Sequence, residues 1–351
     1  MELILHIGLH KTGSTAIQAA LSGYDHQRIM YADLAPKGVL GNKNHSIPVI
    51  ACFKEDFYSY KTFKDRGLST EEIKKLQTIY RNNFENLKNL NKDKIVISGE
   101  EISNLSNDEA NSLLGFFNKI FKKITIIAYV RNPISFAASS FQQQLKGGIH
   151  ELPDYFSPRY KHSLQRFKDH DYVSELVVRD YSLLSKKQID IVTDFCDLCG
   201  IKTSNEKTAP KNSSLSNESI KILFRLNQLH YANHVQWDFK SRQAFIYLLG
   251  KIFPKKEDLP SELILPFADF SEVSWLKTEV GINFERSNNE FRREDLINWC
   301  QDWDDLKEPL YEFASSNKID KSNGLDQIIM NLYRLCMNGM RFKNGDFKLS
   351  N

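Results

Sequence analysis

Residues 3–18 read LILHIGLHKTGSTAIQ, and this stretch determines how the rest of the chain is interpreted. The apolar run 3–7 predicts a short buried strand. A turn containing Gly8 and Gly13 follows, and good helix formers come after Ser14. Glycines let a backbone approach an anion closely, and a helix N-terminus supplies unpaired N–H groups and partial positive charge. The stretch therefore predicts a strand, a turn and a helix that together form a phosphate cradle.

The spacing of Gly8 and Gly13 matches the two glycines of the nucleotide P-loop, but the lysine is misplaced. Ser14 occupies the position that this pattern gives to lysine, and the nearby Lys11 precedes the second glycine. In an ATPase the lysine reaches the β- and γ-phosphates from the position after that glycine. This departure argues against an ordinary ATPase or kinase, and a nucleotide kinase-like phosphotransferase is kept as the alternative enzyme.

Residues 129–141 read YVRNPISFAASSF and form a second candidate phosphate site. They follow the apolar run 124–130, which predicts a parallel-type strand, and they continue into a predicted helix. Arg131 stands at the strand end, where a guanidinium can bind phosphate with two hydrogen bonds. Ser139 comes eight residues later, just over two turns into the helix.

The alternation of predicted strands and helices over the first 200 residues indicates an α/β fold with a three-layer parallel sheet flanked by helices. Further strands are predicted at 94–99 and 175–181. Other elements expected here are a helix that starts near Thr70, helices at about 107–121, 133–145 and 186–199, a loop at 36–44 and an irregular segment at 146–171. We expect a single domain over 1–351, with an α/β core over 1–200 and helical additions over 201–351 that make the C-terminal half helix-rich.

The segment HKTGST at residues 10–15 resembles the 5′-phosphosulfate loop of sulfotransferases that use 3′-phosphoadenosine 5′-phosphosulfate (PAPS). The Arg131 segment resembles the 3′-phosphate site of the same family, and the resemblance covers about residues 3–145. It implies a P-loop NTPase-like sulfotransferase fold, PAPS as the sulfuryl donor, 3′,5′-ADP as the product, and no metal. A basic, glycine-containing segment at 341–346 faintly resembles the family's nucleotide-covering loop.

Carried over residue by residue, the resemblance implies a donor site and a catalytic lysine. Lys11 would stabilise the bridging oxygen as it leaves, and either Ser139 or Ser140 would bind the 3′-phosphate. The residues implied in donor binding are His10, Lys11, Thr12, Gly13, Ser14, Thr15, Arg131 and Ser139.

The acceptor hydroxyl or amine needs a general base. Glu100 follows Ser98 and Gly99 at a predicted strand end, which is similar to the Ser-x-Glu pattern of carbohydrate sulfotransferases with a glutamate base. Glu101 is its neighbour and stays an alternative. His45 is the third candidate, because cytosolic members of the family use histidine. The implied acceptor is a carbohydrate or other small hydroxyl compound, in particular a sugar of a surface polysaccharide or glycolipid.

Composition limits the other functions. The 351 residues are 26% charged and carry a net charge of +3, which suits a small polyanion and does not signal nucleic-acid binding. No stretch reaches the ~18 consecutive apolar residues of a membrane span. The first predicted strand begins at Leu3, so we expect a cytoplasmic protein without a leader segment. The non-enzyme alternative is an inactive module that binds 3′,5′-ADP.

Two motifs that suggest metal or redox chemistry have simpler interpretations. Cys196 and Cys199 lie in an apolar stripe at helical spacing, which favours buried helix cysteines over a zinc or redox pair. His230 and His234 have the i, i+4 spacing of zinc ligands but lack the catalytic glutamate of a metalloprotease. We therefore interpret them as ordinary histidines.

Overall fold

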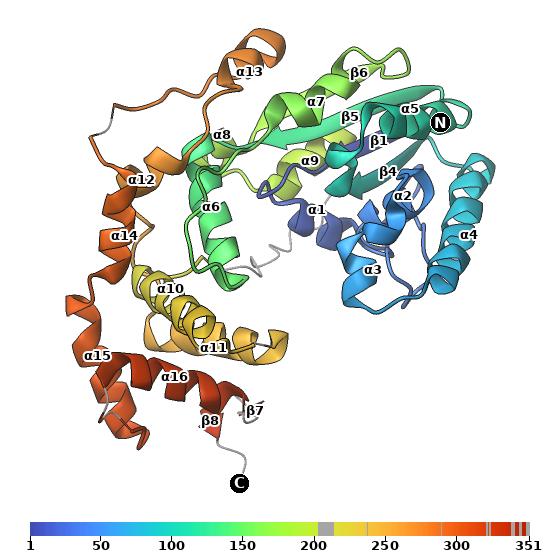
Figure 1. Cartoon of the computed structure of the whole chain (residues 1–351). Coiled ribbons are helices and arrows are strands. Elements are labelled where there is room, and N and C mark those ends of the chain that lie inside the picture. The colour runs from blue at the N-terminus through green and yellow to red at the C-terminus, as the bar shows by residue number, and fades with distance from the viewer. Residues whose placement is uncertain are drawn as a thin grey trace. The chain divides into compact units, whose positions relative to one another are not determined.

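A computed structural model gives the fold (Figure 1). It describes residues 1–202, 214–236, 238–288, 290–320, 322 and 324–337, together with the backbone of 341–343 and 346–348. The segment 341–346 that resembles a nucleotide-covering loop therefore has no described side chains.

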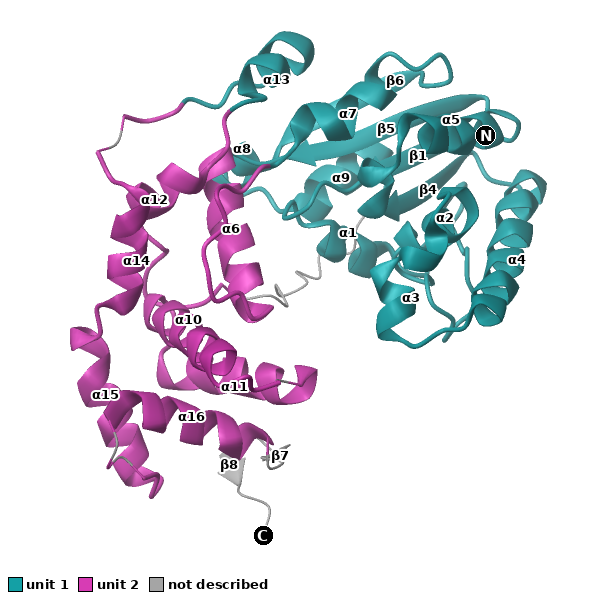
Figure 2. Cartoon of the chain, viewed as in Figure 1, with its two compact units in different colours: residues 1–132, 158–210, 271–285 teal, residues 133–157, 211–270, 286–351 magenta. Residues whose placement is uncertain are grey.

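The chain divides into two compact units whose segments alternate along the sequence (Figure 2). Unit 1 consists of Met1–Asn132, Pro158–Pro210 and Ser271–Glu285. Unit 2 consists of Pro133–Ser157, Lys211–Phe270 and Arg286–Asn351. The division into a core over 1–200 and additions over 201–351 stays a prediction.

Unit 1 is built on a six-stranded sheet in the order β2-β3-β4-β1-β5-β6. All neighbouring strands are parallel except the β2/β3 pair, which is antiparallel. The predicted α/β class, with a mostly parallel sheet flanked by helices, is confirmed. The strands are β1 (Glu2–Ile7), β2 (Asp25–His26), β3 (Ile29–Tyr31), β4 (Lys94–Gly99), β5 (Lys123–Val130) and β6 (Glu175–Asp180).

The central strand β1 is buried on both faces, which explains its nearly continuous apolar sequence. Its residue Leu5 pairs with Ile97 of β4 on one side and with Ile126 of β5 on the other. From β1 the chain runs to β3 and β4 on one side and later to β5 and β6 on the other. Such a reversal of direction marks the place where open α/β sheets bind ligands, beyond the carboxyl ends of the strands.

Helices cover both faces of this sheet (Figure 1). On one face Ile17 of α1 and Phe195 of α9 share a buried cluster with Ile4 and Ile127 of the sheet. Strand residues of the opposite parity, such as Leu3 and Leu5, are fully buried on the other face. There α2, α5 and α7 contact the strands β4, β5 and β6 respectively. The helices and 3-10 turns of unit 1 are α1 (Ser14–Leu21), α2 (Ser46–Phe53), η1 (Phe57–Ser59), α3 (Lys61–Asp65), α4 (Thr70–Asn86), η2 (Leu87–Asn89), η3 (Glu101–Asn104), α5 (Asn107–Asn118), α7 (Tyr160–Lys168), α8 (Tyr181–Lys186), α9 (Ile191–Cys199) and α13 (Val273–Val280).

Two local predictions are wrong. Residues 160–168 form α7 inside the segment expected to be irregular. The helix expected over 186–199 begins only at Ile191, as α9, and residue 186 is instead the last residue of α8. The later start occurs because Gln188 has a left-handed backbone (φ 56°) and Asp190 caps α9 by accepting hydrogen bonds from the N–H groups of Val192 and Thr193.

Unit 2 is helical, as expected for the C-terminal half. Its buried core joins α6 with residues of the later helices, including Phe141, Leu223 and Leu332. Its elements are α6 (Pro133–Lys146), α10 (Asn217–Ala232), α11 (Phe239–Ile252), α12 (Ser261–Ile264), η4 (Leu265–Phe267), α14 (Arg293–Gln301), α15 (Asp304–Ser316), α16 (Gly324–Met337), β7 (Arg341–Lys343) and β8 (Asp346–Lys348).

A buried guanidinium holds the C-terminal end of α6. Arg242 is 1% exposed and donates hydrogen bonds to the carbonyl oxygens of Leu145 and Lys146. It also donates to Oδ1 of Asn227 at 2.6 Å, and Asn227 in turn donates to the Leu145 carbonyl at 3.0 Å. Cationic donors at this position satisfy the last carbonyls of a helix and complement its dipole.

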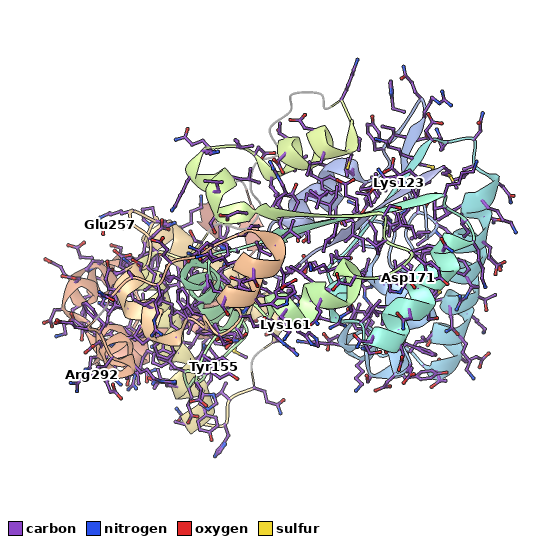
Figure 3. All side chains as sticks on the ribbon, turned by 90° about the horizontal axis from the view of Figure 1, so that it is seen from above. Lys123, Tyr155, Lys161, Asp171, Glu257 and Arg292 are labelled. Atoms are coloured by element: carbon purple, nitrogen blue, oxygen red, sulfur yellow. The ribbon has the colours of Figure 1, made fainter. Side chains whose placement is uncertain are left out.

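Charged side chains lie on the outside of each unit, for example Lys123 and Asp171 in unit 1 and Glu257 and Arg292 in unit 2 (Figure 3). The five cysteines are buried and free, which confirms the interpretation of Cys196 and Cys199 as buried helix cysteines. Within the residues described above, none of the helices combines the length and the apolar character needed to cross a membrane.

Candidate functional site

The candidate site lies in unit 1, at the carboxyl ends of the three central strands. The glycine loop 8–13 follows β1, Glu100 follows β4 and Arg131 follows β5. Because β4 and β5 both flank β1 in parallel, their ends meet at the edge where the loop leaves the sheet.

The loop between β1 and α1 has an unusual backbone at two positions. Lys11 has φ 66° and Gly13 has φ 83°, both in the left-handed region. Glycine adopts this conformation freely, but in lysine it costs about 1–2 kcal/mol. Thr12 is buried and closes the turn by donating from Oγ1 to the Leu9 carbonyl at 2.6 Å. Strain of this kind is typical of loops that bind ligands.

Gly13 is also the N-cap of α1, and it offers no side-chain hydrogen bond to the first turn of that helix. A Cβ at this position would lie 3.2 Å from Cγ2 of Ile191 on α9. The first N–H groups of α1 are therefore not capped by a side chain at Gly13, and a bound anion could accept them.

Ser14 opens α1 with a buried hydroxyl that lacks a partner. The side chain is 1% exposed, and its Oγ has no hydrogen-bond partner in the structure. Gly8 packs directly on it, since a Cβ on Gly8 would lie 2.2 Å from Ser14 Oγ and 3.0 Å from Cγ of Glu100. Gly8, the first glycine of the motif, is thus required by close packing, and Ser14 has a hydrogen-bonding capacity that the protein does not use. This unused hydroxyl fits the expectation of an oxyanion ligand.

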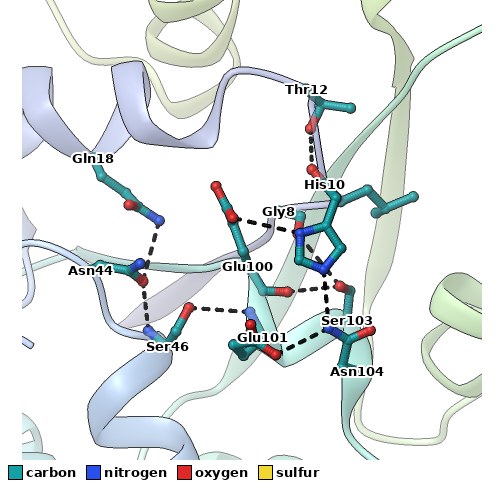
Figure 4. A network of polar contacts seen from close by, with 11 residues as sticks. Gly8, His10, Thr12, Gln18, Asn44, Ser46, Glu100, Glu101, Ser103 and Asn104 are labelled. Atoms are coloured by element: carbon teal, nitrogen blue, oxygen red, sulfur yellow. Dashed lines mark hydrogen bonds and ion pairs between the residues drawn. The ribbon is translucent and has the colours of Figure 1, made fainter. Parts of the chain in front are cut away.

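Glu100 lies beside this loop and carries an unusual carboxyl group (Figure 4). Its side chain is 29% exposed, and Oε2 lies 3.8 Å from Nδ1 of His10. Desolvation raises the pKa of Glu100, the charges of His10 and Lys11 oppose this rise, and Glu101 adds to it. A carboxylate with a raised pKa next to a cationic loop is a candidate general base.

The neighbouring Glu101 is engaged elsewhere. Its Oε2 accepts a hydrogen bond from Nδ2 of Asn104 at 3.1 Å, and its N–H donates to Oγ of Ser46 at 3.1 Å. Asn104 Nδ2 also lies 3.3 Å from Nε2 of His10. Glu101 therefore has a hydrogen-bond partner of its own, whereas the Glu100 carboxylate faces His10.

Arg131 joins the loop to the end of β5. Its Nη1 donates to the backbone carbonyl of Lys11 at 2.9 Å, and its guanidinium lies 5.4 Å from the ring centroid of Tyr181. The carbonyl of Arg131 accepts a hydrogen bond from the hydroxyl of Tyr160 at 2.5 Å. Two tyrosines that the sequence analysis did not single out therefore fix this arginine.

His45 is fully buried and lies against Ser98, near the end of β4. Its Nδ1 accepts the N–H of Ser98 at 3.0 Å, and its ring stacks on Tyr31 with a centroid distance of 4.4 Å. Burial lowers the pKa of His45 to about 3.

The structure gathers most of the predicted residues but not all. His10, Lys11, Thr12, Gly13, Ser14, Thr15, Glu100 and Arg131 all belong to the β1, β4 and β5 ends of unit 1. Ser139 and Ser140 are half-buried on α6 of unit 2, and their part in donor binding stays a prediction. Among the described residues there is no group of three or more histidines, cysteines or carboxylates arranged to hold a metal ion.

Comparisons with known proteins give only distant likeness. No family model and no curated protein matches the chain. Among solved structures, a sulfotransferase domain from the curacin biosynthetic pathway is 14% identical, with 81% of this chain and 98% of that chain covered and a TM-score of 0.35. A sulfotransferase from Alicyclobacillus acidocaldarius is 13% identical over 68% of this chain and 98% of its own, with a TM-score of 0.37. A sulfotransferase domain from the Synechococcus PCC 7002 olefin synthase is 14% identical over 74% of this chain and 95% of its own, with a TM-score of 0.32. Values this low carry no argument, so the function is argued from the site itself.

Proposed function

We propose that this chain is a PAPS-dependent sulfotransferase that transfers a sulfuryl group to a hydroxyl of a carbohydrate, such as a surface polysaccharide or glycolipid. The observation that carries the proposal is the contact of Arg131 with the Lys11 carbonyl, with Glu100 close to the same loop. Two cationic side chains and a helix N-terminus at one sheet edge suit a donor with two anionic ends.

In this proposal the loop binds the 5′-phosphosulfate. The N–H groups at the start of α1 and the hydroxyls of Ser14 and Thr15 donate to the phosphate oxygens. Arg131 binds the 3′-phosphate, with Ser139 or Ser140 as a further donor. The nucleotide is thereby fixed at both ends, and positioning of this kind supplies much of the rate enhancement in group transfer.

Lys11 and Glu100 carry out the proposed chemistry. Glu100 accepts the proton of the acceptor hydroxyl while the oxygen attacks sulfur, and the bond from sulfur to the bridging oxygen breaks. Lys11 neutralises the negative charge that develops on that oxygen, and the oxygen leaves as part of 3′,5′-ADP. We assign the base to Glu100 rather than His45, because the His45 ring is buried and its Nδ1 already accepts a backbone hydrogen bond. The Glu101 carboxylate is bound to Asn104.

A thermal-shift panel tests the donor. The proposal expects 3′,5′-ADP to raise the melting temperature, while ADP and ATP with Mg²⁺ have little effect, because binding to the native state alone stabilises it. Stabilisation by ATP with Mg²⁺ and not by 3′,5′-ADP would overturn the proposal in favour of a phosphotransferase. Transfer of radiolabelled sulfate from PAPS to neutral and acidic oligosaccharides then tests the acceptor class. Donor binding with no transfer to any acceptor would instead support an inactive binding module.

A further inference from the structure

A short segment, Asn44–Ser46, contacts the end of β4 on both sides of Glu100. Before Glu100, Nδ1 of His45 accepts the N–H of Ser98 at 3.0 Å, and the N–H of His45 donates to the Ser98 carbonyl at 2.9 Å. After Glu100, Oγ of Ser46 accepts the N–H of Glu101 at 3.1 Å. The backbone that carries Glu100 is thus hydrogen-bonded to one segment at two points, and the second contact is drawn in Figure 4.

Gly99 shows how closely the two backbones approach. A Cβ on Gly99 would lie 2.7 Å from the backbone nitrogen of Ser46 and 3.1 Å from the carbonyl carbon of His45. No side chain fits there without moving backbone atoms, so the segment lies directly against the residue that precedes Glu100.

The same segment also reaches the helix that follows the glycine loop. Oδ1 of Asn44 accepts the N–H of Ser46 at 2.9 Å and lies 3.5 Å from Nε2 of Gln18 on α1 (Figure 4). Gln18 is 4% exposed, so the α1 side of this contact is buried. A chain of hydrogen bonds therefore runs from α1 through Asn44 and Ser46 to Glu101.

These contacts are buried and directional. His45 and Ser98 are fully buried, and Ser46 is 1% exposed. A buried N–H that loses its acceptor costs far more than an exposed one, because no water replaces the acceptor. The N–H groups of Ser98 and Glu101 each have an acceptor in this segment, and directional bonds of this kind favour one geometry of the backbone around Glu100.

We propose that His45 and Ser46 are positioning residues that fix the Glu100 carboxylate relative to the glycine loop. The role of Glu100 as a base in this inference rests on the proposed function, whereas the position of Glu100 does not. His45 acts through the N–H of Ser98 and Ser46 acts through the N–H of Glu101, so neither touches the reacting atoms. The segment supports the backbone behind the base. It thereby keeps the Glu100 carboxylate within the narrow range of distances from the acceptor hydroxyl that proton transfer requires.

Ser46→Ala is the direct test, because it removes the acceptor of the Glu101 N–H with little change of volume. We expect kcat to fall ~10- to 100-fold, the scale of a base displaced by about 1 Å. The affinity for 3′,5′-ADP should stay within about two-fold, since the donor loop is untouched. Ser46→Thr keeps the hydroxyl and should restore most of kcat. Ser69→Ala is the matched control, because Ser69 also accepts a backbone N–H, from Glu72 at 3.3 Å, at an exposed helix start.

A second pair of variants tests His45 and guards against a folding defect. In His45→Asn the side-chain oxygen stands near the position of Nδ1 and can still accept the Ser98 N–H, whereas His45→Leu cannot. The inference expects the asparagine variant to retain more kcat than the leucine variant. Equal kcat in the two, with melting temperatures also equal, would contradict a positioning role for His45.

Carboxyl ¹³C NMR of the unliganded protein gives a readout that needs no substrate. The Glu100 signal is assigned by its loss in Glu100→Gln and then titrated in Ser46→Ala. A carboxyl released from its fixed, partly desolvated position should titrate at lower pH than in the wild type, because desolvation is the main cause of its raised pKa. An unchanged Glu100 titration in Ser46→Ala, with unchanged kcat, would overturn the inference. If the wild type transfers no sulfuryl group, only the proposed function fails, and the titration still decides whether the segment positions Glu100.

Discussion

The Nη1 atom of Arg131 donates a 2.9 Å hydrogen bond to the backbone carbonyl of Lys11, across 120 positions of sequence. The same residue, Lys11, has a left-handed backbone, with φ 66°. One arginine thereby fixes the loop after β1 to the end of β5. The following predictions test this arrangement and the chemistry proposed for it.

Arg131→Lys should weaken 3′,5′-ADP binding ~10-fold or more, because a single ammonium cannot both hold the Lys11 carbonyl and bind a phosphate with two hydrogen bonds. Isothermal titration calorimetry measures this affinity. Arg81→Lys is the matched control, since Arg81 also donates to a backbone carbonyl, that of Cys52 at 2.7 Å. Equal losses of affinity in both variants would point to general destabilisation.

Lys11→Gly separates the side chain from the backbone at one position. The variant should lose about 10²-fold in kcat, as Lys11→Ala should, because a donor to the leaving oxygen is gone. It should also be more stable than Lys11→Ala by about 1 kcal/mol, since glycine adopts φ 66° without strain. Urea unfolding compares the two. Turnover close to that of the wild type in either variant would remove Lys11 from the mechanism.

Glu100→Gln should abolish the acid limb of the pH–rate profile. In the wild type the rate should fall as pH drops through the raised pKa of Glu100, because protonation removes the base. The contribution of Glu100 to stability changes with pH in the opposite direction to the rate. A carboxyl whose pKa is raised on folding favours the native state below its unfolded pKa, and this benefit is lost as pH rises through the folded pKa. Thermal melts should therefore show Glu100→Gln gaining stability relative to the wild type at pH 8 but not at pH 4.

His10→Ala should shift the acid limb of kcat/KM to higher pH. The charge of His10 opposes the desolvation that raises the pKa of Glu100, so its removal lets that pKa rise further. The pH profile measures the shift directly. His26→Ala, at an exposed histidine of β2, should leave the profile unchanged. A shift toward lower pH in His10→Ala would contradict the assigned contact.

Arg242→Met should destabilise unit 2 by about 3 kcal/mol, because buried carbonyls at the end of α6 lose a charged donor. Arg225→Met is the comparison, since the Arg225 side chain is 40% exposed in its ion pair with Asp326. That change should cost less than about 1 kcal/mol. Urea unfolding of both variants gives the difference, and similar small losses would mean that the buried guanidinium contributes little.

The parts of the fold predicted well are those specified by local pattern. The strands ending at Ile7, Gly99 and Val130 were predicted because buried parallel strands are almost wholly apolar. The two short strands β2 and β3 were missed, since a few residues give no periodicity. The helix α7 was missed because its segment carries little apolar signal beyond a narrow buried face.

The residues of the candidate site that lie in sequence motifs were predicted, whereas the contacts between distant segments were not. Lys11, Ser14 and Arg131 follow directly from strand and loop patterns. The contacts of Tyr160 with Arg131 and of Ser46 with Glu101 join segments 29 and 55 positions apart, and no local pattern marks them. His45 was noted as a candidate base, but its complete burial depends on the packing of Tyr31 and β4 around it.

The alternation of the two units along the chain has a consequence for biosynthesis. Residues 271–285 of unit 1 leave the ribosome only after residues 133–157 and 211–270 of unit 2. Neither unit is encoded by one uninterrupted stretch of gene, so no simple truncation yields either of them whole. Unit 1 therefore cannot be completed until most of unit 2 has been synthesised, so the two units cannot fold strictly one after the other as the chain emerges.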